Sequence, residues 1–91
     1  MSPIDPDSAW SLHPQVSVRP EPFGALLYHF GTRKLSFLKD RTLLTVVEGL
    51  AGAPNARVAC ETAGVADEQV PTYLRALGTL AASQMLVERA A

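Results

Sequence analysis

The chain contains few of the residues that build catalytic centres or cross-links. Its 91 residues include one cysteine and two histidines, and only 7% of them are aromatic. A single cysteine excludes an internal disulfide and any zinc site built from several cysteines. No apolar run approaches the roughly 18 residues of a membrane-spanning helix. The N-terminus also lacks the cationic and hydrophobic regions of a signal peptide. We therefore expect a cytoplasmic protein without a membrane partner.

An excess of charge of one sign is also missing. Eight Lys and Arg residues stand against nine Asp and Glu residues, for a formal net charge of −1, which does not favour binding to a polyanion. The length suits one domain with one modest core. We assign residues 10–91 to this single domain and residues 1–9 to a flexible N-terminal tail. Trp10 and Leu12 are then expected to be the first side chains that contact the domain.

Patterns that carry catalysis or cofactor binding are not found in the sequence. His13 and His29 have no partner at metal-ligand spacing. Cys60 lies in an apolar helical stretch, where a small buried side chain is expected rather than a reactive thiol. The glycines occur singly at turns, and the serines lie in no nucleophile elbow. We predict a non-catalytic protein with no metal site and no cofactor.

Three short β-strands are predicted in the first half of the chain. VSVR (16–19) alternates apolar and polar residues, and Pro20, which has no N–H, is expected to end its pairing. ALLYHF (25–30) and RKLSFL (33–38) are rich in strand formers and are separated by Gly31-Thr32, where the chain can reverse. An antiparallel meander is the simplest arrangement of these strands.

The two faces of the third predicted strand differ in composition. Because successive side chains of a strand point to opposite sides, Leu35 and Phe37 share one face. Lys34, Ser36 and Leu38 share the other face. We expect Leu35 and Phe37 to pack against the helices.

Helical periodicity replaces the strand pattern after residue 39. The first helix is predicted over residues 40–52, with Asp40 as N-cap and Gly52 as its end. A second helix is predicted through ARVACETA (56–63), with Pro54 in its first turn.

A third helix is predicted over residues 67–82, with Asp67 as N-cap and Pro71 in the first turn. Residues 84–89 fit either a strand or an extension of this helix. The apolar stripe of the third helix comprises Val70, Tyr73, Leu74, Leu77 and Leu80. The expected fold class is α+β and winged-helix-like, with a three-stranded antiparallel sheet followed by three helices.

Half of the cationic residues gather around the third predicted strand. Of the eight Lys and Arg residues, four fall within nine positions: Arg33, Lys34, Lys39 and Arg41. Charge on an edge strand prevents aggregation between sheet edges. A positive rim beside an open edge can equally receive an extended acidic chain. Both interpretations stay open, and they are compatible.

Three helices with a small sheet also occur in DNA-binding winged helices, in which residues 67–82 would be the recognition helix. The exposed side of this segment carries one cation, Arg75, whereas Asp67 and Glu68 lie at its start. DNA-binding proteins usually neutralise several phosphates, so a DNA-binding regulator is the weaker alternative. A peptide that adds as a fourth strand beside residues 33–38 fits the charge better.

The sequence also resembles a known family. The run WSLHPQVSVRPEPFGALLYHFGTRKLSFL (10–38) is similar to the peptide chaperones of mycofactocin biosynthesis, which are related to the pyrroloquinoline-quinone peptide chaperones. The resemblance is most specific in VRPEPFGALLYHFGTRKLSFL (18–38) and extends more loosely to about residue 88. It implies a winged-helix-like recognition domain without catalysis. Such a domain binds a short ribosomally made precursor peptide and delivers it to a radical S-adenosylmethionine enzyme.

In related recognition domains the leader peptide pairs with the third strand and packs against the third helix, which correspond here to residues 33–38 and 67–82. No motif marks individual contacts, so the contact residues follow from the predicted registers. A proline at Ser36 is expected to remove a backbone donor that the peptide needs. The oligomeric state and the surface that meets the enzyme stay open. The predicted peptide-binding residues are Arg33, Lys34, Leu35, Ser36, Phe37, Leu38, Lys39, Arg41, Tyr73, Arg75 and Leu77.

Overall fold

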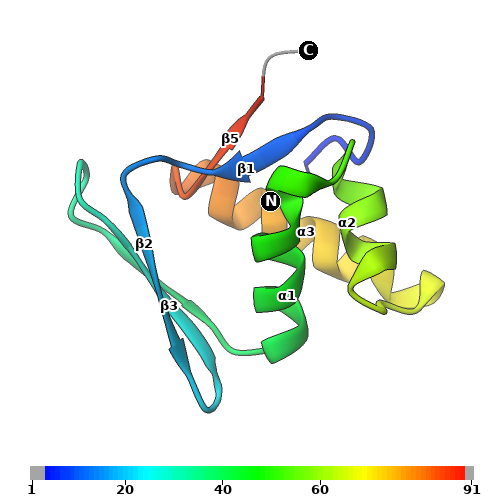
Figure 1. The fold of residues 1–91 in the computed structure, drawn as a ribbon, viewed down its shortest axis with the longest axis horizontal. Coiled ribbons are helices and arrows are strands. Elements are labelled where there is room, and N and C mark those ends of the chain that lie inside the picture. The colour runs from blue at the N-terminus through cyan, green and yellow to red at the C-terminus, as the bar shows by residue number, and fades with distance from the viewer. Residues whose placement is uncertain (1–3, 90–91) are drawn as a thin grey trace.

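The computed structural model describes residues 4–89, which form two antiparallel sheets and three α-helices (Figure 1). The larger sheet has the strand order β2-β3-β4 and precedes the helices in the chain. Its strands are β2 (Val16–Glu21), β3 (Gly24–His29) and β4 (Leu35–Leu38). The predicted α+β class, with a three-stranded antiparallel sheet followed by three helices, is confirmed.

A second, two-stranded sheet joins the two ends of the chain. β1 (Trp10–Leu12) pairs with β5 (Leu86–Glu88), so the segment 84–89 contains a strand and does not extend the last helix. Gln84 adopts a left-handed conformation, with φ of 64°, where that helix ends. The guanidinium group of Arg89 then holds this sheet to the end of the first helical segment. It donates hydrogen bonds to four backbone carbonyls, those of Trp10, Leu50, Ala51 and Ala53.

The three α-helices follow the predicted segments, with short 3₁₀ turns at two of their ends. Asp40 caps the first helix as predicted, because its side chain accepts the N–H of Thr42 at 2.8 Å. A 3₁₀ turn over Leu50–Gly52 ends this segment at the predicted glycine. The helices are α1 (Arg41–Gly49), α2 (Ala56–Thr62) and α3 (Val70–Ala82).

Two predicted helix starts are wrong in detail. Asn55 caps α2 by accepting the N–H of Val58 at 2.8 Å, so Pro54 lies before the cap and outside the first turn. Asp67 begins a 3₁₀ turn (Asp67–Gln69) and is not the N-cap of α3. Pro71 does lie in the first turn of α3, where its missing N–H has no helical partner to lose.

The N-terminal segment is packed against the helices from Ile4 onward. Ile4 is 6% exposed and belongs to the core, and its N–H donates to the carbonyl of Leu74 at 3.4 Å. The carbonyls of Pro6 and Ser8 accept the N–H groups of two residues at the start of α2. Burial of an isoleucine side chain contributes about 1.5–3 kcal/mol, which favours this docking. The expectation that Trp10 and Leu12 are the first side chains to contact the domain is therefore wrong. Residues 1–3 of the predicted tail lie outside the described residues.

The hairpin between β2 and β3 runs through the prolines. Pro20 stays paired with Ala25, so the expectation that it ends the pairing of this strand is wrong. The pairing tolerates a proline because β2 is an edge strand, and only one side of its backbone is hydrogen-bonded. Gly24 is required where the hairpin closes, since an added Cβ atom would lie 1.9 Å from the carbonyl oxygen of Leu38.

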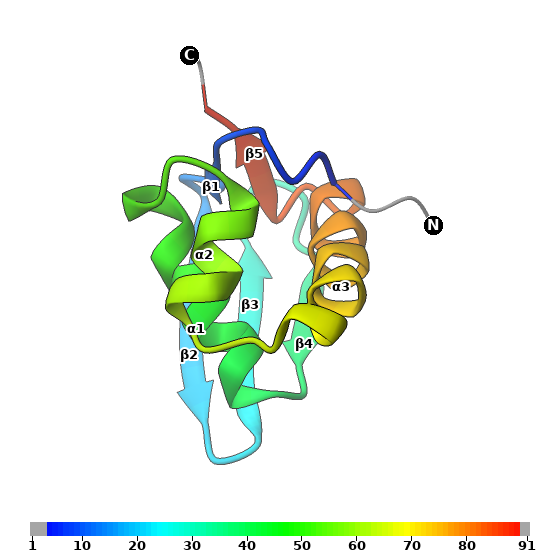
Figure 2. The ribbon, with the colours of Figure 1, turned by 90° about the vertical axis from the view of Figure 1, so that its right-hand side faces the viewer.

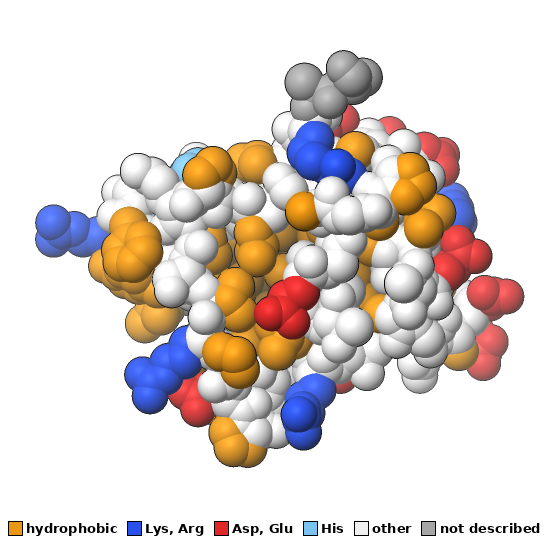
Figure 3. Space-filling model, in the orientation of Figure 1, with side chains coloured by type: hydrophobic (Ala, Val, Ile, Leu, Met, Phe, Trp, Pro, Cys, Tyr) orange, Lys and Arg blue, Asp and Glu red, His pale blue; other side chains and the backbone are white. Residues whose placement is uncertain are grey.

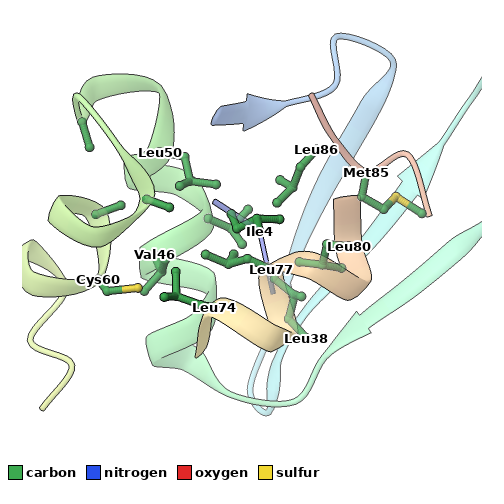
Figure 4. Close-up of a cluster of buried hydrophobic side chains, with 14 of the residues drawn as sticks. Ile4, Leu38, Val46, Leu50, Cys60, Leu74, Leu77, Leu80, Met85 and Leu86 are labelled. Atoms are coloured by element: carbon green, nitrogen blue, oxygen red, sulfur yellow. The ribbon is translucent and has the colours of Figure 1, made fainter. Parts of the chain in front are cut away.

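The core lies among the three helices and is covered on one side by the inner face of the β2-β3-β4 sheet (Figure 4). Leu38 is 1% exposed and belongs to it, whereas Leu35 and Phe37 are 57% and 60% exposed. The face of β4 that was expected to pack on the helices therefore points away from them. The cross-strand register explains the reversal, because Leu38 lies opposite Ala25, and Ser36 opposite Leu27, on the buried side of β3.

Candidate functional site

The outer edge of β4 has no strand partner among residues 4–89. β4 is the last strand of its sheet, and the two chain ends pair with each other in the smaller sheet. Figure 2 shows β4 at the side of the sheet nearest α3. An unpaired strand edge presents a row of N–H and C=O groups that an extended chain can bind.

The register identifies the backbone groups on this open edge. The N–H of His29 donates to the carbonyl of Lys34 at 3.0 Å, so the hydrogen-bonded pairs of β3 and β4 continue at Leu27 and Ser36. The N–H and C=O groups of the alternate residues, Leu35 and Phe37, point to the open side. This corrects the expectation for Ser36, whose N–H belongs to the ladder with β3.

A shallow groove lies between the start of α1 and α3, just beyond the end of β4. It holds a cavity of about 120 Å³ lined by Asp40, Leu43, Thr72, Tyr73 and Ala76. These residues come from the residue that caps α1, from α1 itself and from one side of α3. The groove offers room for small apolar side chains.

A hydrogen bond closes one end of this groove. The hydroxyl group of Tyr73 donates to the carboxylate of Asp40, which also caps α1. This hydrogen bond is the main reason why the pKa of Asp40 lies below its usual value. The same contact raises the pKa of Tyr73. Tyr73 therefore joins α3 to the start of α1. Its side chain is half-buried and lines the groove.

The predicted contact residues lie at different depths. Leu38 and Leu77 are 1% and 0% exposed, so both are core residues and neither side chain forms part of the groove surface. Arg75 lies on the other side of α3, where it lines a larger cavity of about 420 Å³ together with Ile4 and Arg57. Tyr73 is the only one of the three predicted α3 residues that lines the groove.

The four predicted cations are all exposed, and none of them belongs to a strand, because β4 begins at Leu35 and not at Arg33 as predicted. Lys39 and Arg41 lie between the end of β4 and the start of α1. Arg33 and Lys34 lie in the turn that precedes β4, where Arg33 adopts a left-handed conformation with φ of 62°. The basic residues therefore lie at both ends of β4, as a positive rim to the open edge.

Sequence reasoning missed the part that His29 plays in this turn. The side chain is 3% exposed, and its Nδ1 atom accepts the N–H groups of Gly31 and Thr32 at 3.0 and 3.1 Å. His29 also lies against His13, with ring centroids 4.3 Å apart. The imidazole thus shapes the turn that positions Arg33 and Lys34. The one signal in the sequence is its place two residues before the turn glycine.

The described part of the chain shows no centre for metal or thiol chemistry. Residues 4–89 contain no group of three or more His, Cys, Asp or Glu side chains that could hold a metal ion. No helix in this range has the length and apolar character to cross a bilayer. Cys60 is buried as predicted, and burial is the main cause that raises the pKa of its thiol above the usual value. A protonated, enclosed thiol is a poor nucleophile.

The chain belongs to the peptide chaperone MftB family, whose model matches residues 9–87. It is 66% identical over 88 residues to the peptide chaperone MftB of Mycobacterium tuberculosis, which covers 97% of this chain and 81% of that protein. The peptide chaperone MftB of Mycolicibacterium smegmatis is 68% identical over 84 residues, or 92% of this chain and 82% of that protein. No solved structure matches the chain. These relatives are named as chaperones, a non-catalytic role, and the family resemblance of residues 10–38 is confirmed.

Proposed function

We propose that this member of the MftB family is a non-catalytic chaperone for the mycofactocin precursor peptide. The peptide adds as a fourth strand to the outer edge of β4, and the complex delivers it to a radical S-adenosylmethionine maturation enzyme in the cytoplasm. The observation that carries this proposal is the open edge of β4 beside a groove. The family name of the relatives supports a peptide as the ligand.

The backbone of β4 supplies the part of the affinity that depends little on peptide sequence. Leu35 and Phe37 each direct an N–H and a C=O group to the open side. A hydrogen bond of this kind contributes a net ~1 kcal/mol. Up to four of them would contribute about 4 kcal/mol, which is half of the roughly 8 kcal/mol of a micromolar interaction.

Side chains around the edge supply selectivity. Leu43, Tyr73 and Ala76 line the cavity that would receive alternate side chains of the added strand. Lys34 and Lys39, at the two ends of β4, face acidic groups of the peptide. Charges of this exposed kind increase the association rate and set the orientation more than they add to affinity.

A map of NMR chemical shifts during titration with the precursor peptide tests the proposal. The backbone amides of Leu35 and Phe37 are expected to shift most, together with residues 72–76 on α3. Small shifts at β4 combined with large shifts elsewhere would contradict strand addition. A mobility-shift assay with duplex DNA tests the alternative of a winged-helix regulator, which has Arg75 as the single cation on α3. We expect no complex with DNA.

A further inference from the structure

On the face of the β2-β3-β4 sheet that points away from the helices, the side chains of β3 and β4 are apolar, whereas β2 contributes Ser17 and Arg19. Two cross-strand pairs lie on this face, Leu26 with Phe37 and Tyr28 with Leu35. Phe30 follows them and packs edge-on against Tyr28, with ring centroids 5.0 Å apart. We call these five residues the outer face. Leu35, Phe37 and Phe30 are 57%, 60% and 61% exposed.

This exposure is confined to one region of the molecule. The exposed large hydrophobic residues of the described chain are Phe23, Phe30, Leu35 and Phe37, and all of them belong to the larger sheet or its turns. A sheet with one face on the core normally carries polar residues on the other face. A contiguous apolar patch on a monomer usually marks an interaction site. The outer face contributes no residue to the hydrophobic core cluster.

The surroundings of the outer face are positive although the whole chain is not. Residues 16–39 contain four cations and one carboxylate, whereas the complete chain has a net charge of −1. The carboxylate, Glu21, is already paired with Arg19 at 3.1 Å. Figure 3 shows hydrophobic and cationic side chains at the sheet end and most of the acidic ones at the helical end. The cations are Arg19, Arg33, Lys34 and Lys39.

We propose that the outer face is a docking surface for a second protein that presents an apolar patch bordered by carboxylates. The inference rests on the proposed function, in which this partner is the maturation enzyme. A second copy of the chain is a poor occupant, because a twofold interface would bring the positive rims together. An anionic lipid surface is the other possible occupant of a positive region, and the vesicle measurement below tests it.

The position of the outer face next to the open edge gives it a further property. A strand added to β4 continues the sheet, so its alternate side chains lie beside Leu35 and Phe37 on the outer face. The enzyme would then contact the chaperone and the peptide on one composite surface. The two ligands therefore bind cooperatively, and each strengthens the binding of the other by the same factor.

The test uses residues of β3 and its turn, because they lie away from the edge that pairs with the peptide. The double variant Leu26→Thr/Phe30→Ser removes apolar surface from the outer face. The matched control is Val58→Thr, at a half-buried position on α2. Calorimetry measures the affinity of each protein for the precursor peptide, for the purified radical S-adenosylmethionine enzyme, and for the enzyme in the presence of saturating peptide.

We expect the double variant to bind the enzyme about tenfold more weakly, which is typical for loss of interface anchors, while its peptide affinity stays within about twofold. Unchanged enzyme affinity would overturn the inference. So would a wild-type dimer in sedimentation that the double variant disrupts, or uptake by anionic lipid vesicles that the double variant loses. If the wild type binds the enzyme through this face but does not bind the peptide, the proposed function fails and the docking surface stands.

Discussion

The two edges of the β2-β3-β4 sheet differ in what their backbones offer to another strand. The residues of β2 whose backbone N–H and C=O positions point away from β3, toward the open edge, are Val16, Val18 and Pro20. Val16 already donates its N–H to the carbonyl of His13 at 2.9 Å, and Pro20 has no N–H. Only Val18 retains a free donor. On β4, by contrast, Leu35 and Phe37 both have unpaired donors and acceptors.

The difference shows how one small sheet can block one edge and keep the other available. Proline is a common means of preventing strand addition at an exposed edge. In β2, a proline occupies a position whose backbone faces the open edge. β4 has no proline, and its end lies next to the groove between α1 and α3. The proposed binding at β4 and the protection of β2 would therefore have the same physical origin, which is the direction of the backbone donors.

Proline substitutions at the two edges should have the largest and most unequal effects. The double variant Leu35→Pro/Phe37→Pro removes both donors on the open side of β4. We expect peptide affinity to fall about 100-fold, because each unsatisfied carbonyl costs about 1–3 kcal/mol. Calorimetry with the precursor peptide measures this loss.

Two controls separate the backbone from the side chains. Leu35→Ala/Phe37→Ala keeps both donors and should retain most of the affinity for the peptide. Val18→Pro removes the remaining donor of the β2 edge and should leave the affinity unchanged. Equal losses for the β2 and β4 proline variants would show that the edges are not distinguished by their donors.

Arg89 tests how strongly the two chain ends are held together in the smaller sheet, away from β4. Its guanidinium group binds backbone carbonyls of β1 and of the segment after α1. Arg89→Met keeps most of the aliphatic packing and removes these donors, so we expect about 2 kcal/mol lower stability. Urea unfolding followed by circular dichroism measures the change, with Arg57→Met on the exposed surface of α2 as control. A change below about 0.5 kcal/mol would mean that β1 and β5 stay paired without this residue.

Tyr73→Phe tests the contact that closes the groove beside β4. Loss of the hydrogen bond to the partly exposed carboxylate of Asp40 should lower stability by about 1 kcal/mol at neutral pH. The folded pKa of Asp40 is lowered mainly by this contact, so its contribution is present above the unfolded pKa and disappears as pH falls through the folded pKa. Wild type and variant should therefore converge in acid. A difference in stability that persists at low pH would assign the effect to packing.

Charge reversal around β4 should have the smallest effect on affinity. Arg33→Glu/Lys34→Glu should slow peptide association several-fold and reduce its dependence on salt, because exposed charges act mainly on encounter. The matched variant Arg57→Glu/Arg75→Glu, on the helices, should change neither quantity. Stopped-flow measurements at two ionic strengths compare them. If both variants associate with the peptide at the wild-type rate, the rim serves solubility alone.

Much of the fold could be predicted from local patterns. The strand formers around Gly31-Thr32, the Asp40 cap and the position of Pro71 each act within a few residues, so the sequence contains the relevant information. Sequence reasoning placed Ile4 in a tail because a lone isoleucine among prolines and aspartates forms no pattern. The pocket between α2 and α3 that receives it is created by residues far along the chain.

The candidate site could be predicted as a region but not residue by residue. β4, α3 and the four cations were identified, and Tyr73 does line the groove. Leu77 is buried and Arg75 lies across the helix, because a helical stripe does not reveal which neighbour each side faces. The role of His29 was missed because its hydrogen bonds depend on the conformation of the turn.

By itself the sequence determined which side chains share a face, since the twofold alternation of a strand is set by its own backbone. It also determined that Pro20 offers no donor. Only the tertiary structure decided that Leu38 points inward and Phe37 outward, because that choice depends on the register with β3. The same register directs the free backbone N–H and C=O groups of Leu35 and Phe37 toward the open edge of the sheet. The pairing of β1 with β5, distant in sequence, leaves that edge open.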